Sequence, residues 1–192
     1  MILNGYDFSH WQTDAQIRAV MAGCDFVFHK ATEGTTYRDK ELNKRCQWLF
    51  KDRPGFVYHY LRADRPNVEG EVVNFVTMVN YVEDVIDDKI GVAIDVEYSS
   101  KTGGTKNTDF EYFKRFCEEL RKRCNKRLIV YMPDLYSSAW YNWIREMDYG
   151  LWIARYRSKR PEHACDFWQY TNSPLDKDYF FGDYEKLESF VS

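Results

Sequence analysis

The chain has 192 residues, about the length of one domain, because domains commonly run to roughly 100–200 residues. Its 44% hydrophobic and 30% charged residues exclude a disordered or collagen-like chain. The 27 Lys and Arg against 30 Asp and Glu give a net charge of −3, so no global basic surface points to a nucleic-acid partner. We therefore expect residues 1–192 to form a single folded domain.

Short apolar runs that predict strands alternate along the chain with amphipathic segments that predict helices. Strands are expected at about 2–9, 26–28, 56–61, 91–97, 128–132, 151–154, 166–170 and 178–181. Helices are expected at about 13–23, 39–51, 72–82, 108–120 and 135–145, with a short one at 184–190. Thr13 with Gln16, and Thr108 with Glu111, have the spacing of a capping box at a helix start.

Alternation of strands and helices favours a parallel sheet covered by helices, and eight strands favour closure into a barrel. The last three strands have no convincing helix between them. The expected fold is therefore an α/β, irregular TIM-like barrel of eight strands and five main helices, (β/α)5(β)3. An open, doubly wound sheet is the competing topology. Neither G-x-G-x-x-G after the first strand nor a P-loop motif occurs, so nothing favours nucleotide binding.

The cysteines and the apolar segments indicate in which cellular compartment the protein is made. Five cysteines, without a C-x-x-C pair, favour reduced thiols and synthesis in a cytoplasm. No stretch approaches the ~18–20 apolar residues of a membrane span. The N-terminal segment lacks the basic and apolar regions of a signal peptide. His, Asp and Glu show no metal-ligand spacing, so we expect no metal and no cofactor.

Two acids lie at the end of the fourth expected strand. Because side chains alternate along a strand, Asp95 and Glu97 share one face, with Cα atoms ~6.5–7 Å apart. Asp7 has the equivalent late position in the first strand. Close carboxyl groups in a cleft push their pKa values apart, as glycoside hydrolysis requires of its acid. Loop-edge charges paired with Lys or Arg are the alternative interpretation of the D-x-E pair.

An excess of aromatic residues supports the carbohydrate interpretation. Trp, Tyr and Phe make up 18% of the chain, and sugar rings stack on such side chains. Four of them lie in strands whose ends should frame a groove: Tyr58, Tyr131, Trp152 and Trp168. Others form helix stripes that should pack in the core: Phe110, Phe113 and Phe116. Among the histidines, His29 and His59 should be structural, whereas His10 lies near the expected mouth and could contact substrate.

Seven segments, taken in order, resemble glycoside hydrolase family 25, the lysozymes that cleave peptidoglycan as N-acetylmuramidases. They are YDFSHWQ at 6–12, FHKATEGT at 28–35, VYHY at 57–60, DVE at 95–97, IVY at 129–131, LWIARY at 151–156 and FWQY at 167–170. The first contains a D-x-S-x-x-Q motif, and the fourth lies where the family has its D-x-E pair. The resemblance covers essentially the whole chain and implies an irregular barrel of eight strands and five helices.

The resemblance also implies roles for individual residues. Glu97 would be the general acid, Asp95 would stabilise the reacting centre or the N-acetyl group, and Asp7 would support the acid electrostatically. Asp176 aligns with a fourth acid of the family, although the connection before it is shorter than usual. Substrate contacts are expected from a further set of residues: Tyr58, Tyr131, Lys30, Trp152 and Gln169.

The expected activity is hydrolysis of the β-1,4 bond between N-acetylmuramic acid and N-acetylglucosamine in bacterial peptidoglycan, by a monomer. Strand geometry alone permits retention or inversion, whereas the resemblance favours retention. The alternatives are an inactive peptidoglycan-binding or phage structural module, and a chitin-type glycosidase. We expect release to the cell wall after cytoplasmic synthesis, as for a phage endolysin, or secretion if a signal sequence has been removed.

Overall fold

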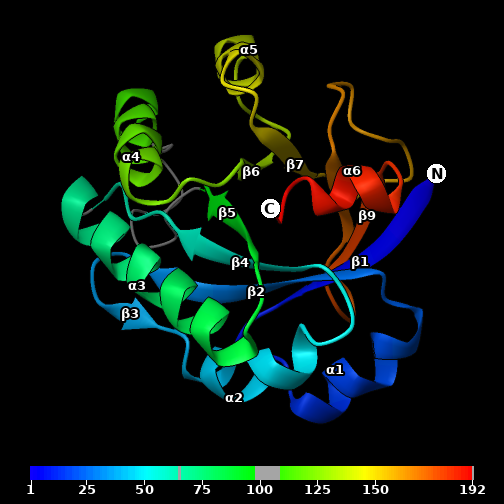
Figure 1. The fold of residues 1–192 in the computed structure, drawn as a ribbon. Coiled ribbons are helices and arrows are strands. Elements are labelled where there is room, and N and C mark those ends of the chain that lie inside the picture. Colours follow the sequence, from blue (N-terminus) through cyan, green and yellow to red (C-terminus); the bar gives the residue numbers. More distant parts are fainter. Residues whose placement is uncertain (65, 98–108, 192) are drawn as a thin grey trace.

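A computed structural model of the chain describes residues 1–64, 66–97 and 109–191 (Figure 1). Within this part of the chain, eight strands close into a barrel: β1 (Ile2–Phe8), β2 (Phe26–Glu33), β4 (Gly55–Tyr60), β5 (Gly91–Asp95), β6 (Leu128–Pro133), β7 (Gly150–Ala154), β8 (Phe167–Thr171) and β9 (Lys177–Phe181). Closure follows from β1, which pairs with β9 on one side and with β2 on the other. The barrel prediction is confirmed, and the open sheet was wrong.

Five helices follow the first five barrel strands, as the (β/α)5(β)3 pattern requires. They are α1 (Asp14–Val20), α2 (Lys40–Leu49), α3 (Val68–Ile86), α4 (Phe110–Arg123) and α5 (Ser138–Glu146). Figure 1 shows these helices around the outside of the strands, with the short α6 (Tyr184–Glu188) beside β9. A 3-10 turn, Met21–Gly23, extends α1.

The two expected helix starts have different outcomes. At α1, Thr13 and Gln16 form the predicted capping box. At α4, the expected capping residue Thr108 lies outside the described residues. Asp109 is the residue whose side chain caps this helix, because its Oδ1 accepts hydrogen bonds from the backbone N–H groups of Glu111 and Tyr112.

The sheet departs from the expected parallel arrangement at β9, which is antiparallel to both β1 and β8. The reason is the short connection after β8, because only antiparallel neighbours can be joined without a long crossover. A further strand that the sequence pattern did not predict, β3 (Tyr37–Arg38), pairs with the end of β2. Two residues are too few to produce a recognisable alternation.

Two hydrophobic clusters fix the strands. One lies between the sheet and the helices and contains Phe113 and Phe116 of α4, with Phe110 packed against it, as expected. The other fills the barrel and is rich in aromatic rings, including Phe28, Phe56 and Phe167. Phe190, just after α6, belongs to this inner cluster and contacts the first residues of β5 and β7. The inner core is therefore closed at the amino ends of the parallel strands.

Candidate active site

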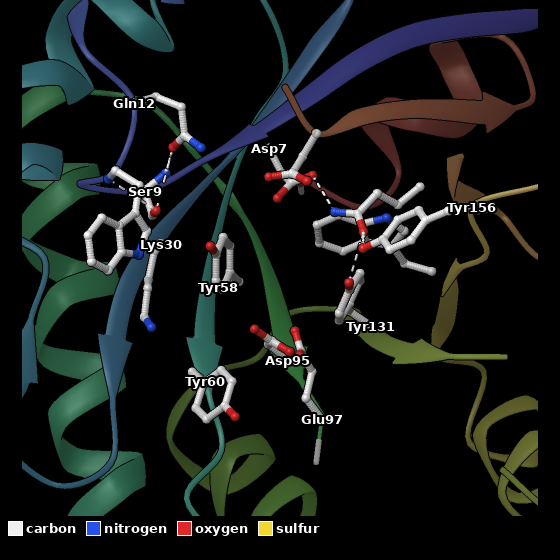
Figure 2. A pocket seen from close by; sticks show the side chains of 14 residues that line it. Asp7, Ser9, Gln12, Lys30, Tyr58, Tyr60, Asp95, Glu97, Tyr131 and Tyr156 are labelled. Atoms are coloured by element: carbon white, nitrogen blue, oxygen red, sulfur yellow. Dashed lines mark hydrogen bonds between the residues drawn. The ribbon is translucent and has the colours of Figure 1, made fainter. Parts of the chain in front are cut away.

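A cavity of about 270 Å³ opens at the opposite end of the barrel, where the parallel strands terminate (Figure 2). All nine residues that the sequence predicted for the site line this cavity: Asp7, Lys30, Tyr58, Asp95, Glu97, Tyr131, Trp152, Gln169 and Asp176. Five further residues line it: Ser9, Trp11, Gln12, Tyr60 and Tyr156. Strands from most of the barrel thus converge on one space.

The end of β5 positions Asp95 and Glu97 on the same side. Val96, between them, is buried in the outer core, and its N–H donates to the Tyr131 carbonyl oxygen at 2.9 Å. Pairing with β6 therefore continues past the last strand residue, so alternation turns both acids into the cavity, as Figure 2 shows.

The carboxyl groups of Asp95 and Glu97 are in hydrogen-bond contact. Asp95 Oδ1 is buried and meets no donor among the described residues. Burial, then the charge of Glu97, raises the pKa of Asp95 well above its usual range, and burial raises the pKa of Glu97. Since a carboxylate cannot donate a hydrogen bond, the contact requires one proton on the pair.

Asp7 is held by a chain of side-chain hydrogen bonds. Tyr131 and Tyr156 both donate their hydroxyl groups to Gln169 Oε1, at 2.9 and 2.6 Å. Gln169 Nε2 in turn donates to Asp7 Oδ2 at 2.7 Å, and the dashed lines of Figure 2 trace this path. The two tyrosines fix the orientation of the amide, so it presents its NH2 group, not its oxygen, to Asp7.

Asp178, which sequence analysis missed, lies buried beside Asp7, and the two side chains form a hydrogen bond. Its Oδ1 accepts from Trp152 Nε1 at 2.8 Å, whereas Oδ2 is buried without a donor among the described residues. Burial raises the pKa of Asp178 to about 7. Burial, followed by the charges of Asp178 and Asp176, raises the pKa of Asp7 well above its usual range.

Asp176 lies two residues before Asp178 and lines the cavity itself. Burial, and then the charge of Glu97, raises the pKa of Asp176 to about 6. The site therefore gathers four acids around one small space, with Asp178 beneath them. Such a set favours protonated carboxyl groups near neutral pH, because each ionised member makes ionisation of the next more costly.

Lys30 is the cation of this cavity. It faces inward with its Nζ 2.8 Å from Glu33 Oε2 and 4.9 Å from the centre of the Tyr60 ring. Arg62 binds the other oxygen of Glu33 at 2.7 Å. The ion pair of Lys30 is therefore with Glu33. The positive charge still acts on the two neighbouring acids, since it opposes the rise in pKa of Asp95 and Glu97.

Trp152 forms the floor of the cavity, and Tyr58 forms one of its walls. The Trp152 side chain is 2% exposed because Phe28 stacks on it with ring centres 4.0 Å apart and Tyr131 meets it edge-on at 4.6 Å. It therefore supports the cavity and binds Asp178 rather than offering a free ring face. Burial raises the pKa of the Tyr58 phenol well above its usual value, so this hydroxyl remains a donor.

Trp11 supplies an exposed ring at the rim, with 80% of the residue accessible. The His10 ring packs against it at a tilt, with ring centres 4.5 Å apart, and is itself held by Asp39, with Nδ1 3.1 Å from Oδ2. Ser9 and Gln12 of the same segment are joined through the Ser9 N–H at 2.9 Å. His10 is not among the residues that line the cavity, and its observed contacts are with Trp11, Asp39 and Tyr37.

The other histidines are structural, as expected. His29 is buried on the outer face of β2, with Nδ1 2.8 Å from the Lys30 carbonyl oxygen, and burial lowers its pKa to about 4. His59 is also buried, with Nε2 3.0 Å from Glu71 Oε2.

The expected groove position of Trp168 was wrong. Trp168 belongs to the outer cluster, because it alternates with the inward-facing Gln169.

A second cavity, of about 630 Å³, adjoins the first. The two share three lining residues: Glu97, Tyr131 and Tyr156. The second cavity is otherwise lined by the end of β6, the end of β7 and the residues that follow them: Pro133, Asp134, Leu135, Ala154, Arg155 and Arg157. Figure 2 shows Tyr156 on the opposite side of the acids from Ser9 and Lys30. Together the cavities make an elongated groove with Glu97 between its halves.

Neither a metal site nor a membrane span is found in the described parts of the chain. Across residues 1–64, 66–97 and 109–191, no three His, Cys, Asp or Glu residues are grouped so as to hold a metal ion. No helix within those ranges combines the length and apolar character needed to cross a bilayer.

The model of the family described as glycosyl hydrolases family 25 matches residues 6–179. The chain belongs to glycosyl hydrolase family 25. It is therefore a glycoside hydrolase, and the resemblance drawn from its motifs is confirmed. A search of curated proteins gave no significant match.

Solved structures share this fold over nearly the full length of the chain. A family 25 glycosyl hydrolase from Bacillus anthracis is 26% identical, with a TM-score of 0.77 and coverage of 99% of this chain and 94% of that one. A family 25 lysozyme from Aspergillus fumigatus is 20% identical, with a TM-score of 0.77 and full coverage of both chains. The catalytic domain of an endolysin from bacteriophage P40 of Listeria monocytogenes is 20% identical, with a TM-score of 0.75 and coverage of 100% and 98%.

Proposed function

We propose that this glycoside hydrolase is a lysozyme that cleaves the β-1,4 bond between N-acetylmuramic acid and N-acetylglucosamine in bacterial peptidoglycan. Support comes from the family and from the names of its structural neighbours, which include muramidases, lysozymes and a phage endolysin. The observation that carries the proposal is the pair formed by Asp95 and Glu97, which holds a proton at the centre of an elongated groove.

Glu97 is the general acid. It lines both cavities, whereas Asp95 lines only the first, so Glu97 is the member of the pair that reaches toward a bond crossing from one cavity to the other. Its raised pKa, caused by burial, keeps a proton available for the oxygen of the leaving sugar. The tyrosines on the shared wall, Tyr131 and Tyr156, flank the scissile bond.

Asp95 acts as a stabiliser rather than as a nucleophile. Its carboxyl group is within hydrogen-bond reach of Glu97, closer than the ~5–5.5 Å that separates an acid from a nucleophile in retaining glycosidases. In the proposed route, the substrate's N-acetyl oxygen attacks the anomeric carbon while Glu97 protonates the departing oxygen. Asp95 accepts the N–H of the acetamido group and stabilises the resulting oxazolinium ion.

Water then completes the reaction with retention of configuration. Glu97, now a carboxylate, takes a proton from the water whose oxygen bonds to the anomeric carbon, and the oxazolinium ring opens to restore the acetamido group. Asp7 and Asp176 add negative potential beside the developing positive charge. Asp7 is set in place by Gln169, and the groove walls are supplied by Tyr58, Trp152 and Lys30.

Glu97→Gln tests the acid. The substitution keeps the shape of the side chain and removes its acidic proton, so we expect release of new reducing ends from purified cell walls to fall by about 100- to 10,000-fold, with a melting temperature no lower than that of the wild type. Glu111→Gln is the matched control, because Glu111 lies on the outside of α4 and its side chain is 73% exposed. Full activity of the Glu97→Gln variant would exclude Glu97 as the acid.

The substrate class is tested in the same assay. We expect peptidoglycan to be cleaved in preference to chitin, because N-acetylmuramic acid carries a branch that N-acetylglucosamine lacks. Equal or faster release from chitin would favour the chitin-type glycosidase. Binding of cell walls without release of reducing ends would favour an inactive binding module.

Action on the bacterial wall follows from this substrate. The glycan strands of peptidoglycan are the proposed partner, reached from the cytoplasm as by a phage endolysin or from outside after secretion. The similarity in fold to an endolysin catalytic domain accords with the first route.

A further inference from the structure

The second cavity offers chemistry that differs from that of the first, and the following inference rests on the proposed function. The first cavity is dominated by carboxyl groups: Asp7, Asp95, Glu97 and Asp176. The second holds two arginines, Arg155 and Arg157, and an exposed apolar side chain, Leu135, of which 70% is accessible. The two halves of the groove are therefore suited to different parts of a substrate.

The positions of the two catalytic acids give the groove a direction. The stabilising group of a glycosidase lies at the anomeric carbon, while the general acid lies between that carbon and the leaving group. Asp95 is confined to the first cavity, and Glu97 faces both. The sugar whose anomeric carbon reacts thus occupies the first cavity, and the leaving part of the strand occupies the second.

Glu97 lines the second cavity too, but its carboxyl group belongs to the pair with Asp95 that holds a proton. The other charged residues are Asp134, Arg155 and Arg157, and they leave one cation uncompensated. Arg155 Nη1 is 2.5 Å from Asp134 Oδ2, and both side chains are mostly buried, so these two charges neutralise each other. Arg157 is exposed at the edge of the same cavity, and its guanidinium has no hydrogen-bond or ion-pair partner among the described residues. The cavity can therefore take one negative charge, next to the apolar side chain of Leu135 and the ring of Tyr156.

We propose that Arg157 binds the lactyl carboxylate of the second sugar on the leaving side of the cleaved bond. The leaving strand begins with N-acetylglucosamine, which has no charge, and continues with N-acetylmuramic acid, whose lactyl group carries a carboxylate wherever no peptide is joined to it. A guanidinium forms strong, paired hydrogen bonds with such a group. Arg157 is then a specificity residue, which makes the enzyme prefer substrates that extend at least two sugars beyond the cleaved bond.

Three tetrasaccharides test this proposal. Each consists of alternating N-acetylglucosamine and N-acetylmuramic acid and ends in a reducing-end muramic acid, whose lactyl group is a free acid, a methyl ester or an amide to a short peptide. Cleavage of the central bond is followed by chromatography for wild-type enzyme and for Arg157→Gln. We expect the substitution to lower kcat/KM for the free acid by about three- to tenfold, mainly through KM, and to leave the ester unaffected.

The control variant is Arg160→Gln, which removes a cation from the same segment. Arg160 stacks over Phe181 at 3.5 Å and lines neither cavity, so this variant should treat all three substrates as the wild type does. Equal rates of Arg157→Gln and wild type on the free acid would overturn the inference. So would an equal loss on acid and ester. A loss confined to the peptide-bearing substrate would assign Arg157 to peptide carboxylates and overturn the lactyl assignment.

Failure of the proposed function would look different. If the wild-type enzyme left the central bond of all three tetrasaccharides intact, the proposed muramidase activity would be wrong, and the inference would fall with it. If the wild type cleaved all three substrates and only the Arg157 dependence were absent, the muramidase activity would stand and the inference alone would fail.

Discussion

Asp7 and Asp178 show how individual residues set the electrostatics of this site. Both are almost fully buried, and apart from the hydrogen bond between them, the side-chain donors that the described residues offer them are Gln169 and Trp152. Two adjacent carboxylates in an apolar barrel would repel each other, so the pair shares a proton over a wide range of pH. Asp7 and Asp178 together therefore carry about one negative charge, not two, near the pair formed by Asp95 and Glu97.

This arrangement makes stability depend on pH through Asp178. Its folded-state pKa is about 7, against 3.8 for an unperturbed carboxyl group, so the folded protein holds a proton that the unfolded chain has lost. Stability therefore falls as pH rises from about 4 to about 7, and the loss is complete above that range. For an isolated carboxyl group this difference would amount to about 4 kcal/mol, an upper bound for a coupled pair.

Asp178→Asn should remove that dependence. An asparagine is neutral, and its carbonyl oxygen can accept from Trp152 while its NH2 group donates to Asp7. We expect the variant to melt at a higher temperature than wild type at pH 8, with the advantage shrinking toward pH 4. Thermal melts across this range, with Asp52→Asn at an exposed position as control, measure the effect. A constant difference between variant and wild type from pH 4 to pH 8 would contradict the shared proton.

The sequence predicts much of the site at this scale, but not all of it. Asp7, Asp95 and Glu97 could be predicted because alternation along a strand determines which face each acid occupies. The same reasoning could have found Asp178, since it lies two residues after Asp176. Its Oδ2, however, is buried without a hydrogen-bond partner among the described residues, and only the three-dimensional structure shows this. Trp11 follows a strand in a loop, where no periodicity indicates the direction of a side chain.

At the scale of elements, the barrel is a tube closed at one end and open at the other. The apolar runs predicted the eight strands because each buries a continuous hydrophobic face. The orientation of β9 depends on the length of a connection, and β3 exists only because β2 continues past the barrel to pair with it. These features arise from tertiary geometry, so the pattern of apolar residues does not contain them.

Phe190 closes the barrel at the amino ends of the parallel strands. Substituting it tests whether this closed end and the open end with the cavity act independently. Its ring is fully buried against Phe167 and Phe180, with ring centres 5.5 and 6.2 Å away. We expect Phe190→Ala to lower the free energy of unfolding by about 3–5 kcal/mol in denaturant titrations, and Phe190→Leu to lower it by less. The kcat of the folded fraction should be unchanged, because the proposed catalytic acids lie at the other end of the barrel. A lower kcat at a temperature where the variant is fully folded would show that the two ends are coupled.

At the scale of the whole molecule, positive and negative charges nearly balance. A net charge of −3 provides no long-range attraction to an anionic cell wall. In the proposed function, recognition therefore rests on short-range contacts in the groove, with acids around the reacting sugar and a cation on the leaving side. The expectation that the enzyme works as a monomer stays a prediction. The central claim is that the enzyme cleaves at the anomeric carbon of N-acetylmuramic acid and retains the configuration of that carbon.

Proton NMR of a fresh peptidoglycan digest tests that claim most directly. The anomeric signals identify the sugar at each new reducing end and its initial configuration before mutarotation. The proposed mechanism predicts N-acetylmuramic acid at the new reducing ends, appearing first as the β-anomer. New reducing ends on N-acetylglucosamine, or an initial α-anomer of muramic acid, would contradict it.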